Sequence, residues 1–135
     1  MLPASSRLKI LDAGCGLGFM SYLAAKCFPN AAITGVDTFE DESLIDSSLE
    51  KATQNMRVLN LGDRVHFRKH DLREPLDPET IFDLAVSNLV FHNLGKERFL
   101  AYSNILDRVV SGGYFVIADL FPSQSADLKY FKEKC

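Results

Sequence analysis

Short apolar runs alternate along the chain with longer and more polar segments. Each run is rich in Val, Ile, Leu or Ala and ends near Gly, Pro, Asp or Asn, a pattern typical of buried strands. The runs predict strands at residues 8–12, 32–37, 65–69, 82–88 and 113–120. The segments between and after them predict helices at residues 19–28, 42–60, 96–110 and about 123–133.

The helix predicted at residues 42–60 has the clearest boundaries. Its first turn is acidic, Glu40 to Glu42, which suits a helix N-terminus, and Gly62 stands just past its end. Apolar residues at roughly helical spacing predict its buried stripe: Leu44, Leu49, Ala52, Met56 and Leu59. In contrast, Pro75 and Pro78 predict a loop or short turn between residues 71 and 81.

The alternation of strands and helices predicts the fold class. Parallel strands joined by right-handed helical crossovers are the usual result of this order. We therefore expect an α/β fold with a doubly wound, mostly parallel sheet of five strands. At 135 residues and 47% hydrophobic composition, the chain is expected to form a single domain over residues 1–135.

Composition narrows the function classes. The sequence has no apolar stretch of about 18 residues, and residues 1–10 lack the apolar core of a signal peptide, so we expect a cytoplasmic protein that does not enter a membrane. A net charge of −3 indicates no nucleic-acid partner. The three cysteines lack C-x-x-C spacing and the three histidines fall in different elements, so no metal site is expected.

A glycine-rich loop follows the first predicted strand. Residues 10–19 read I-L-D-A-G-C-G-L-G-F, with glycines at 14, 16 and 18 before the first predicted helix. Glycine lets backbone N–H groups approach a ligand, and a helix N-terminus attracts anionic groups. A tight strand-to-helix turn without a ligand explains the same glycines. A dinucleotide fingerprint requires a third small residue at position 19, where this chain has Phe19.

Polar residues end the next three predicted strands. Asp37 lies 19 residues after Gly18, where a carboxylate can accept both hydroxyls of a ribose, whether of an adenosyl group or of NAD. Asp71 follows the third strand, and the fourth ends in the run F-D-L-A-V-S-N, up to Asn88. For Asp71 and Asn88, a plain turn or capping role remains open.

Together these landmarks resemble the class I S-adenosylmethionine-dependent methyltransferases. Asp12 to Gly18 matches that family's motif I, and residues 82–88 match its motif IV; the resemblance runs from about Lys9 to Leu120. The full Rossmann-like family fold adds an antiparallel hairpin after the fifth strand, which residues 121–135 do not supply. The resemblance implies S-adenosylmethionine as cofactor, with contacts from Asp12, Gly14, Cys15, Gly16, Gly18, Asp37, Thr38, His70, Asp71, Leu72 and Asn88.

The resemblance further implies methyl transfer to an unidentified acceptor, with His92 as candidate general base. Residues 88–91 lack the Asn-Pro-Pro-aromatic sequence of enzymes that methylate adenine or glutamine amino groups, which favours a small-molecule acceptor. A non-catalytic S-adenosylmethionine-binding module completed by a partner is the main alternative, and an NAD-linked oxidoreductase is disfavoured by Phe19. The uncharged apolar strand at residues 114–118 predicts pairing of its edge with a second copy or a partner subunit.

Overall fold

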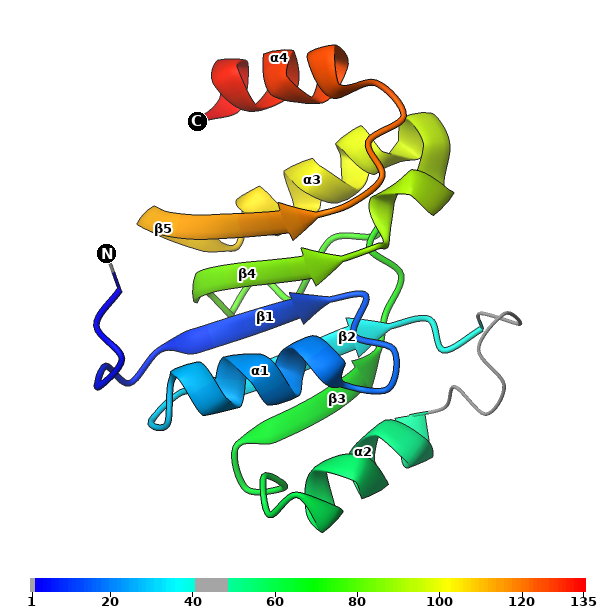
Figure 1. The fold of residues 1–135 in the computed structure, drawn as a ribbon. Helices are drawn as coiled ribbons and strands as arrows, with labels where there is room; N and C mark the ends of the chain where they lie inside the picture. The colour runs from blue at the N-terminus through cyan, green and yellow to red at the C-terminus, as the bar shows by residue number, and fades with distance from the viewer. Residues whose placement is uncertain (1, 41–48) are drawn as a thin grey trace.

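The computed structural model describes residues 2–40 and 49–135. It contains one five-stranded sheet in the order β3-β2-β1-β4-β5, in which every pairing is parallel (Figure 1). The strands are β1 Lys9–Ala13, β2 Ala32–Asp37, β3 Val65–Lys69, β4 Phe82–Asn88 and β5 Val109–Ala118. The strand order reverses between β1 and β4, so the loops that follow these two strands leave the sheet on either side of a crevice. The predicted fold class is confirmed.

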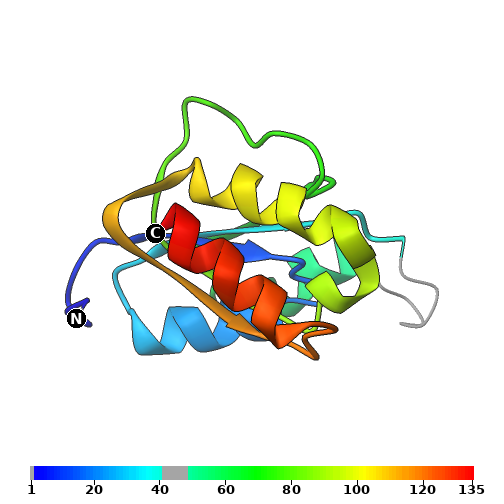
Figure 2. The same cartoon turned by 90° about the horizontal axis from the view of Figure 1, so that it is seen from above.

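Helices cover both faces of the sheet (Figure 2). Helices α1 Phe19–Cys27 and α2 Leu49–Val58 lie on one face. The 3-10 helix η1 Phe91–Glu97, α3 Arg98–Leu106 and α4 Gln124–Lys134 lie on the other. No helix within the described ranges combines the length and apolar character needed to cross a membrane.

Adjacent strand residues supply the two halves of the core. Ile10 packs with Ala25 and Met56 on the face of α1 and α2, whereas Leu11 packs with Tyr102 on the face of α3. Both Ile10 and Leu11 are fully buried. Because a central parallel strand is buried on both faces, its sequence is a continuous apolar run rather than an alternating one.

The α2 prediction is confirmed only in part. Ala52 and Met56 are buried as expected, but Leu49 and Leu59 are exposed by 37% and 45%. The helix ends at Val58, so Leu59 lies in the turn beyond it and Leu61 takes the buried position. Residues 41–48, with Leu44 and most of the predicted acidic turn, lie outside the described residues.

The boundary between α3 and β5 also differs from the prediction. Helix α3 ends at Leu106, and β5 begins at Val109 rather than at residue 113. A register shift explains the early start, because Phe82 pairs with Val109 while Leu84 pairs with Tyr114. Residues 109–112 therefore form a bulged extension of the strand, which periodicity does not distinguish from the end of a helix.

A buried ion pair attaches α4 to α3. The guanidinium of Arg98 binds Asp127 through two contacts, Nε to Oδ1 at 2.8 Å and Nη2 to Oδ2 at 3.1 Å. The hydroxyl of Tyr102 donates to the same Oδ1 at 3.0 Å, and Nη1 of Arg98 donates to the carbonyl of Gly95. These contacts hold η1, α3 and α4 together on one side of the sheet.

We expect Asp127→Asn to lower the free energy of unfolding by about 3–5 kcal/mol, because Arg98 would keep its charge in a buried place without a counter-ion. Urea denaturation measures the change. The matched control is Glu133→Gln, which removes the exposed pair between Lys129 and Glu133 on α4 and should cost no more than about 0.5 kcal/mol. Equal losses in the two variants would contradict the structural role of the buried pair.

The two edges of the sheet differ in character. On β3, the exposed residues His66, Arg68 and Lys69 place polar and charged groups along the edge. On β5, Tyr114 and Val116 are exposed by 44% and 53%, and within the described residues no strand pairs with its outer edge. Charged side chains discourage strand addition and an apolar edge invites it.

We therefore expect the chain to self-associate through β5, as measured by light scattering over a range of micromolar concentrations. Val116→Lys should weaken this association, because a charge on the edge opposes strand pairing. Leu128→Lys is the control, since Leu128 is as exposed as Val116 but lies on α4. A monomer at all concentrations, or equal effects of the two substitutions, would contradict association through this edge.

Candidate functional site

The glycine-rich loop lies at the carboxyl ends of β1 and β2 (Figure 1). The backbone N–H groups of Gly14 and Cys15 both donate to the carbonyl of Val36, at 2.8 and 3.0 Å. The N–H of Gly16 donates to Oδ2 of Asp37 at 2.9 Å. The end of β2 therefore holds the loop in place across the strand boundary.

These hydrogen bonds leave little free donor capacity in the loop. The N–H groups of Gly14, Cys15 and Gly16 each have a protein acceptor, as does the N–H of Gly18, which donates to the carbonyl of Cys15. The loop consequently offers a ligand less N–H donation than the glycine pattern suggests. The carboxylates of Asp12 and Asp37 are the prominent polar groups that remain.

Packing explains two of the glycines without a ligand. Gly14 has φ +77°, and a Cβ there would overlap the Cγ2 atom of Val90. Gly18 has φ +93°, and a Cβ there would lie 2.9 Å from Cζ of Phe67. Both positions need glycine to bring the loop against its neighbours. The tight-turn explanation thus accounts for part of the motif.

Asp12 is the residue that a turn alone does not explain. Its side chain is buried, and its Oδ2 accepts a 2.6 Å hydrogen bond from the hydroxyl of Ser21 on α1. Its Oδ1 is enclosed but has no partner among the described residues. Burial raises the pKa of Asp12 to about 6, although hydrogen bonds from Ser21 partly oppose the increase. A buried carboxylate oxygen costs free energy as long as it has no partner.

Asp37 has a structural role and retains capacity for a ligand. Its Oδ1 accepts from the N–H of Phe39 at 2.8 Å, and its Oδ2 accepts from Gly16. Each carboxylate oxygen has a further lone pair, and the residue is only half-buried, as is the neighbouring Thr38. This arrangement is compatible with the expected ribose contact.

The residues after β3 are arranged around an ion pair. Arg73 donates to both oxygens of Asp71, with Nη2 at 2.6 Å from Oδ2, and these hydrogen bonds lower the pKa of Asp71 to about 2. Leu72 is buried in the core, and Nε2 of His70 lies 3.1 Å from the carbonyl of Glu74. The Asp71 carboxylate thus already serves a turn and an ion pair, which supports the structural alternative left open for it.

The segment after β4 reaches the glycine loop. The hydroxyl of Ser87 donates to the carbonyl of Ala13 at 2.8 Å, and Asn88 is half-buried at the strand end. Val90 packs against Gly14, and His92 follows in the first turn of η1. Nδ1 of His92 lies 2.6 Å from Oδ1 of Asp119, directly after β5. Sequence reasoning missed Asp119, although an acid at a strand tip was the signal used for Asp37.

Two other features carry less chemistry. Cys15 is buried and burial raises the pKa of its thiol, so it remains protonated as a small loop residue. No group of three or more potential metal ligands occurs within residues 2–40 and 49–135.

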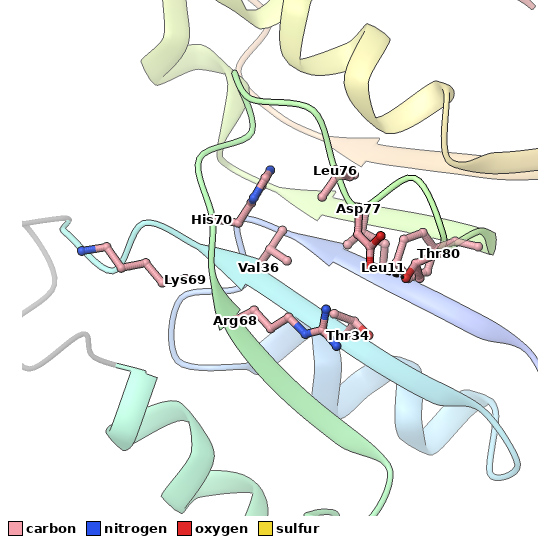
Figure 3. A pocket seen from close by; sticks show the side chains of 10 residues that line it. Leu11, Thr34, Val36, Arg68, Lys69, His70, Leu76, Asp77 and Thr80 are labelled. Atoms are coloured by element: carbon pink, nitrogen blue, oxygen red, sulfur yellow. Dashed lines mark hydrogen bonds between the residues drawn. The ribbon is translucent and has the colours of Figure 1, made fainter.

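A pocket of about 100 Å³ lies on the sheet face under residues 70–80 (Figure 3), and no residue of the glycine loop lines it. Its floor includes Leu11 and Val36, and Arg68, His70 and Asp77 stand around it. Sites for cofactors usually measure about 300–1,000 Å³. The pocket is too small for the expected cofactor, and of the predicted site residues it contains only His70.

We expect Asp12→Asn to raise the free energy of unfolding by about 2–3 kcal/mol at pH 7, because it removes a buried charge whose pKa is raised above the ordinary value. The ligand affinity of this variant should change as well. Asp12→Asn should bind S-adenosylhomocysteine more weakly, since the carboxylate is lost.

In the wild type, the affinity for S-adenosylhomocysteine should fall as pH decreases through about 6, where Asp12 takes up a proton. Urea denaturation and calorimetry measure these effects; lower stability together with unchanged affinity would contradict the assignment.

Comparisons with known proteins identify the family of the chain. A family model described as a methyltransferase domain matches residues 4–135. A malonyl-[acyl-carrier protein] O-methyltransferase of Priestia megaterium is 36% identical over 87 residues, which are 64% of this chain and 28% of that protein. A release factor glutamine methyltransferase of Rhodopirellula baltica is 37% identical over 79 residues, or 58% of this chain and 25% of that protein.

A solved structure shares the fold. The O-methyltransferase of a trans-AT PKS multienzyme of Brevibacillus brevis, in complex with S-adenosyl-L-homocysteine, has a TM-score of 0.67 at 24% identity and covers 84% of this chain and 36% of that chain. The chain thus spans well under half the length of these similar proteins. Because the family model spans nearly all of it, the chain belongs to the methyltransferase-domain family, whose cofactor is S-adenosylmethionine.

Proposed function

We propose that the chain binds S-adenosylmethionine at the carboxyl ends of β1, β2 and β4 and takes part in methyl transfer to a small-molecule acceptor. The unpartnered Oδ1 of Asp12, buried beneath the glycine loop, is the observation that carries the binding proposal. A buried carboxylate without a partner costs free energy in the ligand-free protein. A cationic ligand that reaches this oxygen recovers part of that cost.

The expected contacts follow the cofactor from one end to the other. Asp12 would face the ammonium of the methionine part, and Asp37 the ribose hydroxyls, with Thr38 beside it. Asp71, His70 and Leu72 would stand at the adenine end. When bound, the cofactor supplies an activated methyl group on its sulfonium. The protein then has to hold the acceptor in line with that group and exclude water.

The acceptor is not set by the relatives, whose names give different acceptors: a malonyl-acyl carrier protein in one case and a release factor glutamine in the other. One feature of this chain favours a small molecule: Asn88 is followed by Leu-Val-Phe rather than the Pro-Pro-aromatic sequence found in enzymes acting on amide or adenine nitrogens. The net charge of −3 disfavours a nucleic acid as the acceptor.

Calorimetric titration with S-adenosylhomocysteine and with NAD tests the proposal. We expect the former to bind and NAD not to bind. Asp37→Ala should lower the affinity for S-adenosylhomocysteine about ten- to hundredfold, because charge-assisted hydrogen bonds of about 1.5–3 kcal/mol are lost. The control is Asp63→Ala, which removes an exposed carboxylate between α2 and β3 and should leave the affinity unchanged.

Preference for NAD, or unchanged affinity of a folded Asp37→Ala variant, would contradict the proposed cofactor site. Circular dichroism shows whether the variant is folded. Gly16→Val provides a second variant, because Gly16 has φ +48° and its N–H contacts Asp37. A β-branched residue resists that conformation, so binding should be lost. Binding of S-adenosylhomocysteine without methyl transfer to any acceptor would indicate the non-catalytic module.

A further inference from the structure

An acid–base pair lies beside the proposed cofactor site, at the carboxyl ends of β4 and β5. Nδ1 of His92 is 2.6 Å from Oδ1 of Asp119. The Asp119 side chain is 1% exposed, whereas that of His92 is 28% exposed. The carboxylate is thus enclosed, while the imidazole keeps an accessible side.

Backbone donors occupy the rest of the Asp119 carboxylate. Its Oδ2 accepts from the N–H groups of Val90 at 3.0 Å and Phe91 at 2.7 Å, and its Oδ1 also accepts from Leu120 at 2.7 Å. Burial alone would raise the pKa of Asp119, but the hydrogen bonds from His92 and these N–H groups lower it below its ordinary value. Asp119 is therefore ionised at neutral pH.

The ionised carboxylate determines the tautomer of His92. A carboxylate without a proton only accepts hydrogen bonds, so Nδ1 of His92 must donate. In a neutral imidazole the lone pair then lies on Nε2. Tyr102 on α3 also interacts electrostatically with Asp119, but burial raises the pKa of its phenol, which stays neutral.

The position of the pair relates it to the cofactor loop. Val90, whose N–H is held by Asp119, has its side chain against Gly14. His92 follows two residues later in η1. This helix lies beyond the tips of β4 and β5 (Figure 1). The carboxylate of Asp119 therefore holds the backbone of Val90, which packs against the glycine loop, and also the imidazole of His92.

We propose that Asp119 is a positioning residue that presents Nε2 of His92 as a general base, and that the methyl acceptor is a hydroxyl compound. This inference rests on the proposed methyl transfer. The hydroxyl oxygen bonds to the methyl carbon, the carbon–sulfur bond breaks with its electron pair left on sulfur, and the hydroxyl proton passes to Nε2. Asp119 then faces an imidazolium and stabilises its charge.

The acceptor class follows from what the pair can do. A carboxylate acceptor, with a pKa of about 4, is already ionised at neutral pH and needs no base, whereas a phenol-like hydroxyl, with a pKa of about 10, keeps its proton. A cationic amine is best held by a free carboxylate. Four donors already occupy Asp119, so it is not free for that role.

Nitrogen NMR of the uncomplexed chain at pH 8 tests the pair without any acceptor. We expect His92 to carry its proton on Nδ1, with Nε2 unprotonated; the spectrum of His92→Gln assigns the signals. In Asp119→Asn this preference should decrease, whereas in the control His66→Gln, an exposed residue of β3, it should persist. A wild-type proton on Nε2, or a tautomer that does not respond to Asp119→Asn, would overturn the proposal.

Turnover tests the acceptor class, with methyl-labelled S-adenosylmethionine and a library of phenols, alcohols, carboxylic acids and amines. We expect label in ethers, and a loss of about 10²–10⁴-fold in His92→Gln, with affinity for S-adenosylhomocysteine retained. Asp119→Asn and the double variant should lose a similar amount, because the two residues act as one unit.

Label in esters or amines but in none of the hydroxyl compounds would overturn the assignment, as would additive losses. Label in no compound at all, or failure to bind S-adenosylhomocysteine, would instead overturn the proposed function. The two failures are therefore distinguishable. If Asp119→Asn does not fold, the proposal is still tested by the tautomer of His92 in the wild type and by the turnover of His92→Gln.

Discussion

The attachment of the glycine loop to the end of β2 is the constraint on which the site depends. Three consecutive N–H groups, those of Gly14, Cys15 and Gly16, are held by the carbonyl of Val36 and the carboxylate of Asp37. Parallel pairing of β1 with β2 sets these groups side by side, since Ala13 is in register with Val36. Any displacement of β2 would therefore move both the loop and the acid expected at the ribose.

The same attachment gives the carboxylate of Asp12 an unfavourable free energy of burial. With the loop closed over the end of β1, one oxygen of this carboxylate is satisfied by Ser21 and the other is enclosed without a partner. Native structures leave few buried polar atoms unpaired, and those that persist often have a functional reason. The free-energy cost of this unpaired oxygen is the reason for the proposed contact with a cationic group.

Sequence patterns predicted the sheet well because central parallel strands are uninterrupted apolar runs, and β1 to β4 lie within one residue of their expected bounds. They were less accurate at the start of β5: the helix predicted at residues 96–110 extends into residues 109 and 110, which belong to the bulged start of this strand. The sequence patterns also predicted which residues lie at the ends of the strands, but not the hydrogen bonds that these residues make. Asp71 is paired with Arg73, and Asp37 accepts a hydrogen bond from Gly16. Spacing along the sequence does not show that a carboxylate already has such partners.

Acids at or near the tips of the strands show how environment assigns different tasks to one chemical group. Asp12 is buried with an unpaired oxygen, and its pKa is raised to about 6; Asp71 is paired with Arg73, and its pKa is lowered to about 2. The side chain of Asp119 is also enclosed, but the residue lies nearer the protein surface than Asp12, and four donors keep it ionised. Shallower burial and the larger number of donors both separate Asp119 from Asp12. A carboxylate with several hydrogen bonds can remain charged and orient a neighbouring base, whereas a deeply buried one with a vacant oxygen favours a proton or a cationic ligand.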